Sequence, residues 1–302
     1  MVKIVEMKGL KMEMIELKAL AKINLGLDVL GQRLDGYHTV RMIMQSIYLY
    51  DDVTITKIKS STVEVKTNLY YLPTDENNIA YKAADLLRKE FQIPDGVGIT
   101  IKKRIPVAAG LGGGSANAAA VLYGMNRLFD LGLSPEELMK RGVTLGADVP
   151  YCILRGTVLA EGIGEILSPL PSLPKCTVLV ATPPIHISTG KIYQALDEKC
   201  ITTHPDIDGL VAGLEKGNLR KIATAMGNVL EQVTIPLHPE IRILKQEMLI
   251  GGALGAMMSG SGPTVFGIFD SKELAYKAKD TITKKMLAKQ IYVTKSHTVR
   301  RG

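Results

Sequence analysis

The feature that most constrains this chain of 302 residues is a run of glycines between a strand-like segment and a helix-like segment. The run reads Gly110-Leu-Gly-Gly-Gly-Ser-Ala-Asn117; β-prone apolar residues precede it at 97–105 and an alanine-rich stretch follows at 118–129. Glycines let backbone N–H groups converge with no Cβ in the way, and a helix start adds partial positive charge, so such a loop can hold phosphates. A loop that merely lets a helix pack tightly on a sheet is the structural alternative.

The loop fits neither of the two commonest nucleotide-binding patterns. No Gly-Lys-Ser/Thr sequence ends it, as a P-loop requires, and Ser115 stands where the dinucleotide pattern has its third glycine. If this loop binds a nucleotide, it belongs to a third class of nucleotide-binding site.

A short acidic segment, Gly146-Ala-Asp148-Val-Pro150, stands between a predicted helix and a predicted strand. If the Asp148 side chain faces the phosphate loop, it is a candidate base for a substrate hydroxyl. If it faces outward, it is a loop aspartate that caps a turn. The segment alone leaves both interpretations open.

Strict alternation of apolar and polar residues over 15–29 predicts a strand with one buried face. Lys22 and Asn24 fall on the polar side and therefore point the same way, about 7 Å apart. They form a candidate polar pair, and an exposed sheet face is the alternative. A second glycine-rich segment, Ser259-Gly-Ser-Gly-Pro263, could cover a ligand or simply make a tight turn.

Helical and strand patterns are mixed without regular βαβ alternation, so we expect an α+β protein. A proline-rich stretch at 169–174 places the domain boundary near residue 164, giving domains 1–164 and 165–302. Ser134, Pro135 and Glu137 predict a capped helix start. We further expect helices at 78–91, 118–129, 190–199, 219–231, 240–250 and from 272, and strands at 40–58, 97–105, 151–161, 177–181, 264–269 and 290–294.

Composition narrows the function classes. The formal charge of +7 is spread along the chain, and an aromatic content of 5% without tryptophan disfavours a single-strand nucleic-acid binder. The cysteines, Cys152, Cys176 and Cys200, lack metal-pair spacing and predict reduced thiols in a cytoplasmic protein. The uncharged stretches 107–126 and 248–269 are too rich in Gly, Ser, Asn or Pro to predict membrane spans. We assign no function to the first dozen residues.

Taken together and in order, these segments resemble the motifs of the GHMP kinase superfamily over most of the chain. The resemblance implies an N-terminal domain with a ribosomal-protein-like fold and a C-terminal ferredoxin-like α/β sandwich domain. Within the superfamily the chain is similar to kinases that use ATP, with its Mg²⁺, to phosphorylate a hydroxyl of a CDP-linked polyol. The matching segments are Ala21-Lys-Ile-Asn-Leu-Gly-Leu27, Asp35-Gly-Tyr-His38, Pro106 to Asn117, Gly146 to Pro150 and Gly252 to Gly267.

The resemblance also implies roles for single residues. Asp148 is the expected catalytic base, and Lys22 is expected between Asp148 and the accepting hydroxyl. The sugar-alcohol part of the substrate is expected at Asn24 and Thr189, and the cytosine at Tyr37, His38 and Tyr193. The nucleotide is expected at Lys103, Pro106, Gly110, Leu111, Gly112, Gly113, Gly114 and Ser115. No protein ligand to a metal is predicted.

Three alternatives stay open. The chain could be another kinase of the superfamily, acting on mevalonate, homoserine or a sugar. It could be a nucleotide-binding regulator without catalysis, but the presence of both Asp148 and Lys22 disfavours that alternative. It could also be an RNA-binding module, which the low aromatic content disfavours. We therefore expect a small-molecule partner and neither nucleic acid nor membrane, and both monomer and homodimer remain possible.

Overall fold

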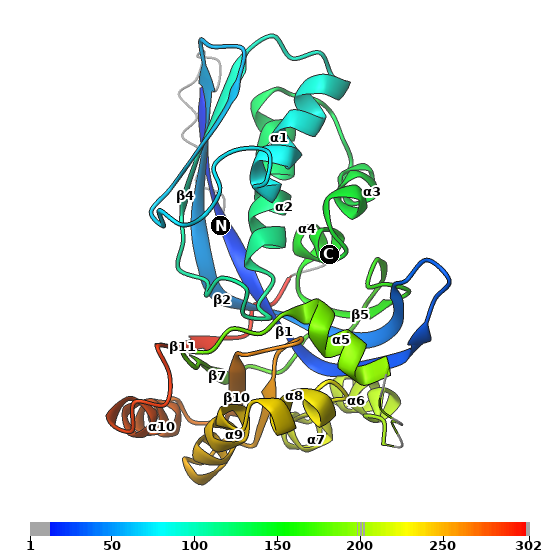
Figure 1. Cartoon of the computed structure of the whole chain (residues 1–302), viewed down its shortest axis with the longest axis vertical. Helices are drawn as coiled ribbons and strands as arrows, with labels where there is room; N and C mark the ends of the chain where they lie inside the picture. Colours follow the sequence, from blue (N-terminus) through cyan, green and yellow to red (C-terminus); the bar gives the residue numbers. More distant parts are fainter. Residues whose placement is uncertain (1–12, 198, 200, 202, 300–302) are drawn as a thin grey trace. The chain divides into compact units, whose positions relative to one another are not determined.

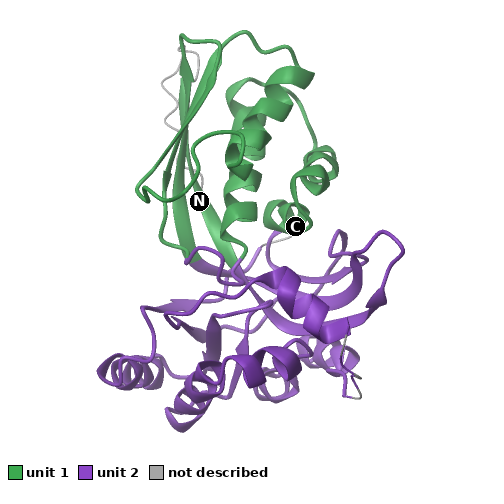
Figure 2. Cartoon of the chain, viewed as in Figure 1, with its two compact units in different colours: residues 1–21, 49–105, 112–154 green, residues 22–48, 106–111, 155–302 purple. Residues whose placement is uncertain are grey.

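The computed structural model describes residues 13–197, 199, 201 and 203–299. The predictions made for the first dozen residues and for Cys200 lie outside the described residues. Contacts divide the chain into two compact units (Figure 2). Unit 1 comprises the described residues of 1–21, 49–105 and 112–154, and unit 2 those of 22–48, 106–111 and 155–302. The predicted domain boundary near residue 164 stays a prediction.

Two long strands contribute residues to both units. These are β1 (Met14–Gln32) and β2 (His38–Ile58), which are hydrogen-bonded neighbours in a sheet of seven strands among the described residues. The strand predicted from the alternation at 15–29 is thus confirmed. In β1 the polar side of that alternation is buried too, since 19 through 29 are all buried residues.

Unit 1 is a sheet with helices against it (Figure 1). The second part of β2 pairs antiparallel with β4, which pairs parallel with β3. Helix α1 contacts β3, β4 and α2, and α4 contacts α2 and α3. The further elements of unit 1 are β3 (Val63–Thr67), α1 (Ile79–Glu90), β4 (Gly96–Lys102), α2 (Gly113–Leu128), α3 (Pro135–Leu145) and α4 (Val149–Leu154).

Small residues bring α2 close to the sheet of unit 1. A Cβ on Gly124 would lie 2.3 Å from Ile55 Cδ1 and 3.0 Å from Leu17 Cδ1, so a larger residue here would require these two side chains to shift. The predicted capping box of α3 is confirmed: Ser134 Oγ accepts from the Glu137 N–H, and the Glu137 carboxylate accepts from the Ser134 N–H. Close packing therefore fixes α2, which follows the glycine-rich loop, and local capping fixes the start of α3.

Unit 2 contains a four-stranded antiparallel sheet among its described residues, in the order β11-β7-β10-β9, with α9 and α10 in contact with it (Figure 1). The first part of β2 pairs with β5, which pairs with β6. The elements are β5 (Thr157–Glu161), β6 (Ile166–Pro169), β7 (Thr177–Thr182), α5 (Thr189–Asp197), α6 (Ile207–Glu215), α7 (Leu219–Ala225), β8 (Gly227–Asn228), α8 (Glu231–Leu237), α9 (Glu240–Ile250), β9 (Gly255–Met258), β10 (Val265–Phe269), α10 (Lys272–Lys284) and β11 (Gln290–Lys295).

Two sequence predictions of elements are wrong. The strand predicted at 151–161 is instead α4 followed by β5. Residues 149–152 are all buried, so no periodicity distinguishes helix from strand there, and Pro150 in the first turn suits a helix start. The helix predicted at 219–231 is interrupted by β8, because Gly227 and Asn228 pair in parallel with Gly26 and Leu27 of β1. The sequence pattern also missed β3, β6, β9, α6 and all but the first residue of α8.

The mixture of helices and largely antiparallel strands is the predicted α+β class. No helix in the described part of the chain combines the length and apolar character that crossing a membrane requires.

Candidate active site

The glycine-rich loop opens α2 in unit 1. Gly112 is the N-cap residue, with a φ of 67°, and no side chain among the described residues caps this helix. Helices α1 and α3, in contrast, are capped by Asn78 and Ser134. The first N–H groups of a helix have no intrahelical partner and attract anions. The start of α2 can therefore offer its amides to a phosphate.

The front of the same loop, Gly110 and Leu111, belongs to unit 2. A Cβ on Gly110 would lie 2.0 Å from the Ser259 carbonyl oxygen, and the residue has a φ of 77°. Ser259 Oγ donates to the Gly110 carbonyl at 2.9 Å, and the Lys22 N–H donates to the Leu111 carbonyl at 3.0 Å. The structure thus brings together the first part of the glycine loop, the second glycine-rich segment and Lys22.

Lys22 and Asn24 lie side by side and are buried, at 5% and 0% exposure. The Lys22 ammonium donates to Asn24 Oδ1 at 2.8 Å, and the Asn24 amide contacts Met42 Sδ at 3.2 Å. A Cβ on Gly260 would lie 3.6 Å from Lys22 Nζ, so this ammonium lies against the second glycine-rich segment. The predicted orientation is confirmed, and the alternative of an exposed sheet face is wrong.

Lys103 takes part in a buried network at the end of β4. Its ammonium donates to Asp51 Oδ2 and, at 3.0 Å, to Asn117 Oδ1. The Asn117 amide donates to the same Asp51 oxygen at 2.9 Å. A Cβ on Gly113 would lie 3.2 Å from Lys103 Nζ, which places the ammonium beside the first turn of α2. Pro106 is also buried and lies in the segment that connects β4 to α2.

Asp51 is a site residue that the sequence analysis missed. A signal was present: Leu49, Val53 and Ile55 are the inward-facing positions of β2, and Asp51 shares their parity. An aspartate at an inward position is almost never fully buried unless it is paired. The alternation therefore predicts a buried, partnered carboxylate at this position.

Asp148 lies in unit 1 between the C-cap of α3, Gly146, and the first residue of α4. It is half-buried, and its carbonyl oxygen accepts from the Cys152 N–H at 3.1 Å within α4. The helix that replaces the predicted strand therefore begins directly after this aspartate, so the residue is held at a junction between two helices.

Several of the expected substrate residues meet in unit 2. The His38 and Tyr193 rings have centroids 4.7 Å apart, and His38 Nε2 lies 2.7 Å from Asp197 Oδ1. Thr189 and Ser261 share a hydroxyl hydrogen bond of 2.8 Å. The Tyr37 ring is 59% exposed, which leaves it able to pack against a ligand. Asp197 is a further residue that the sequence analysis did not select, and Ser261 belongs to the second glycine-rich segment that it singled out.

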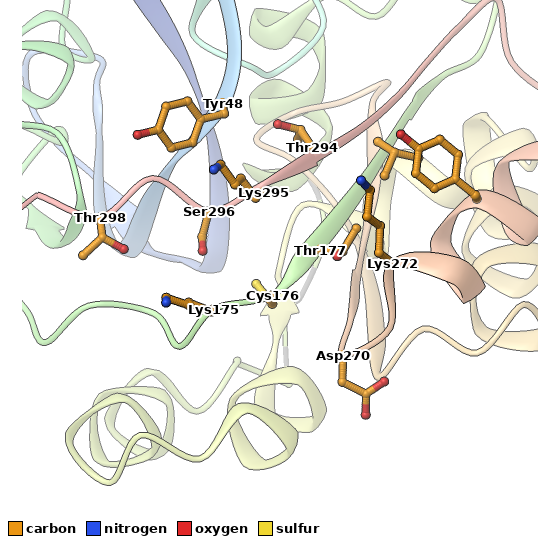
Figure 3. A pocket seen from close by; sticks show the side chains of 12 residues that line it. Tyr48, Lys175, Cys176, Thr177, Asp270, Lys272, Thr294, Lys295, Ser296 and Thr298 are labelled. Atoms are coloured by element: carbon orange, nitrogen blue, oxygen red, sulfur yellow. The ribbon is translucent and has the colours of Figure 1, made fainter. Parts of the chain in front are cut away.

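A hollow of about 970 Å³ lies elsewhere in unit 2, between the edge strand β11, the start of β7 and the first turns of α10 (Figure 3). It is lined by Tyr48, Cys176 and the lysines Lys175, Lys272 and Lys295, among others, and by none of the predicted site residues. Its three lysines are solvent-exposed side chains. Within the described residues, no group of three or more His, Cys, Asp or Glu side chains is arranged to hold a metal ion.

Comparison with known proteins identifies two matching family models. Residues 78–156 match the GHMP kinases N terminal domain, and residues 210–288 match the GHMP kinases C terminal domain. A protein of Lachnospira eligens is 50% identical over 287 residues, covering 95% of this chain and all of that protein. A protein of Lachnoclostridium phytofermentans is 55% identical over 267 residues, 88% of this chain and 92% of that protein. Both are named 4-diphosphocytidyl-2-C-methyl-D-erythritol kinase.

Comparison with solved structures gives the same family. The crystal structure of a 4-(cytidine 5'-diphospho)-2C-methyl-D-erythritol kinase has a TM-score of 0.80 and 31% identity, covering 94% of this chain and 100% of that one. A homoserine kinase from Cytophaga hutchinsonii has a TM-score of 0.74, covers 98% of each chain and is 22% identical, a likeness of fold alone.

Proposed function

The chain belongs to the GHMP kinase family, and from this membership we propose that it uses ATP to phosphorylate the 2-hydroxyl of 4-diphosphocytidyl-2-C-methyl-D-erythritol. The observation that carries the choice of substrate is the 50% identity over the whole length of the Lachnospira kinase of that name. The two-domain fold alone also occurs in a homoserine kinase, so it supports the reaction type without selecting the alcohol.

The loop at 110–115 is proposed to hold the β- and γ-phosphates of ATP. The uncapped start of α2 and the absence of side chains at Gly112, Gly113 and Gly114 fit a phosphate group, since backbone amides can approach it closely. Lys103 and Pro106 precede the loop in the sequence, and both are proposed to lie near the nucleotide. Mg²⁺ bound with ATP would supply neutralisation of the phosphate charge.

Asp148 is proposed to accept the proton of the attacking hydroxyl. Phosphoryl transfer needs mainly positioning and charge stabilisation, so a correctly placed carboxylate and ammonium suffice from the protein. Lys22, buried and already fixed by Asn24, would stabilise both the ionised carboxylate and the developing alkoxide. Asn24 and Thr189 are proposed to bind the methylerythritol hydroxyls.

The cytosine is proposed to pack against Tyr37 and Tyr193 and to hydrogen-bond with His38. Support comes from the tilted ring contact of His38 and Tyr193 and from the exposed Tyr37 ring. Asp197 contacts His38 Nε2, and a partner on one ring nitrogen selects the tautomer that the other nitrogen presents. We further place the enzyme in the cytoplasm, where the thiols of Cys152 and Cys176 would stay reduced.

A panel of alcohols tests the substrate. ADP release would be measured with ATP, Mg²⁺ and, separately, the CDP-linked methylerythritol, mevalonate and homoserine. We expect turnover with the CDP-linked polyol and rates at least 100-fold lower with the other two, since the cytidine contacts would be missing. Faster turnover of mevalonate or homoserine would contradict the assignment. ATP binding without turnover of any alcohol would favour a regulator.

A further inference from the structure

We infer that Asp51 is a positioning residue that fixes the phosphate-binding loop through its two carboxylate oxygens. The inference rests on the proposed function, because it presumes that the start of α2 binds ATP phosphates. It adds to the proposed site a residue that lies outside the glycine motif, on β2.

The first oxygen of Asp51 holds the chain that leads into the loop. Oδ1 accepts from the Arg104 N–H at 2.7 Å and from the Ile105 N–H at 2.9 Å. These two amides come directly after β4, where the ladder with β2 ends at Lys102. The carboxylate therefore replaces the sheet as the hydrogen-bond partner of the backbone just before the glycines.

The second oxygen holds the helix that leads out of the loop. Oδ2 accepts from the Asn117 amide at 2.9 Å and from the Lys103 ammonium. Lys103 also donates to Asn117 Oδ1 at 3.0 Å, so the three side chains form a closed ring of hydrogen bonds. Asn117 lies in the second turn of α2, and the ring therefore ties this helix start to β2 and β4.

Burial makes this network stiff. Asp51 is fully buried, the Lys103 side chain is 5% exposed and Asn117 is 4% exposed. Hydrogen bonds to charged groups are stronger than neutral ones, and removal of one partner from a buried pair leaves an uncompensated charge. The anchor points on both sides of residues 106–116 are thus held more firmly than surface contacts could hold them.

The loop itself cannot supply this rigidity. Gly112, Gly113 and Gly114 have no side chains to pack, and glycine has the widest backbone freedom of any residue. Backbone amides that hold a reacting phosphate must be placed accurately, since a misplacement of about 1 Å can reduce rate by a factor on the order of 10². Ser259 and the Lys22 N–H hold Gly110 and Leu111 directly, and Asp51 adds placement from the residues on both flanks of the loop.

The test compares the same substitution at two places in one helix. Asn117→Ala removes the bond between α2 and Asp51 while the ion pair of Asp51 and Lys103 remains. Asn126→Ala, the control, removes an asparagine at the other end of α2 that bonds both the carbonyl and the N–H of Leu133, at 2.8 and 2.9 Å. Asp51→Asn is the third variant. Each is assayed for melting temperature, for KM and kcat with ATP and with the alcohol, and for binding of a non-hydrolysable ATP analogue.

We expect Asn117→Ala to raise KM for ATP and the Kd of the analogue by about 10-fold, and Asp51→Asn by more, with KM for the alcohol changed less than about twofold. Asn126→Ala should lower the melting temperature with an unchanged KM for ATP. Two results would leave Asp51 with only a structural role. In one, both alanine variants lose stability alike and keep the wild-type KM for ATP; in the other, both variants raise the KM for ATP equally. Failure of the wild-type protein to bind the analogue would instead contradict the proposed function.

Discussion

At the scale of single residues, both lysines of the candidate site are removed from water and paired with a neighbouring polar side chain. Lys22 bonds Asn24, and Lys103 bonds Asp51, in both cases from a strand or strand end. A buried charge without a partner is unfavourable, so each pair fixes the rotamers of both members. Lys22, Asn24 and Lys103 are therefore held in place before any substrate arrives.

The role of Asp148 gives the first prediction. Asp148→Asn should lower kcat by a factor on the order of 10² to 10⁴ and leave the Kd for ATP almost unchanged, because only the proton acceptor is lost. Steady-state kinetics and binding of a non-hydrolysable ATP analogue measure the two quantities. Asp85→Asn is the matched control in unit 1, since that carboxylate pairs with Lys89 on the exposed face of α1. Near-normal kcat in Asp148→Asn would remove this residue from the mechanism.

The thiol of Cys176 gives a prediction about pH. Burial raises the pKa of Cys176 from 9.0 to about 11, while the hydrogen bond with Ser296 acts in the opposite direction. The folded protein thus binds this proton more tightly than the unfolded chain, so the contribution of the thiol to stability is full below about pH 9 and declines as the pH rises towards about 11.

Alkylation of Cys176, followed by mass spectrometry of the labelled peptide, tests this value. The thiolate is the reactive form, so labelling should be slow at neutral pH although the residue lines an open hollow (Figure 3), and should accelerate up to about pH 11. Rapid labelling at neutral pH in the folded protein would contradict the raised pKa.

At the scale of elements, the glycine loop depends on backbone conformations with positive φ, which residues other than glycine adopt less readily. Gly110 has a φ of 77° and lies against the Ser259 carbonyl, whereas Gly132, between α2 and α3, has a φ of 70° with open space around it. The two glycines share the conformational requirement, but only Gly110 also has a steric one. A comparison of alanine variants at the two positions therefore separates the cost of the left-handed backbone conformation from the cost of a steric clash.

Gly132→Ala should therefore reduce the free energy of unfolding by about 1 to 2 kcal/mol, the usual cost of a left-handed alanine. Gly110→Ala should reduce it by more, because its Cβ would lie 2.0 Å from a backbone oxygen, and should also lower kcat/KM for ATP. Urea unfolding and steady-state kinetics measure these effects. Equal losses of stability in the two variants, with normal ATP kinetics, would show that the Ser259 contact is not tight.

The accuracy of the sequence predictions also differs between elements. Alternation predicted β1, and a capping box predicted α3, because these signals are local. The α4 helix was missed because its first four residues are all buried, which leaves no periodicity there, and β8 was missed because its pairing with β1 is a tertiary contact. At the site, motif residues were selected directly. Asp51 and Asp197 were not selected. The parity of Asp51 with Leu49, Val53 and Ile55 indicates that it is buried, but the partners of both aspartates lie far away in the sequence, so their roles follow only from the fold.

At the scale of the whole molecule, the proposed site residues are distributed over both compact units. Asp148, Lys103 and the start of α2 belong to unit 1, whereas Lys22, His38 and Thr189 belong to unit 2. The glycine loop changes from one unit to the other between residues 111 and 112. The proposed reaction therefore requires both units, and neither contains a complete set of the proposed groups.

The measurement that tests this claim most directly is a crystal structure with both the CDP-linked methylerythritol and a non-hydrolysable ATP analogue bound. We predict the Asp148 carboxylate within about 3 Å of the 2-hydroxyl, the Lys22 ammonium beside both, and the γ-phosphate against the amides of residues 110–115. A structure in which the bound alcohol contacts neither Asp148 nor Lys22, or in which the phosphates bind away from the glycine loop, would contradict the account.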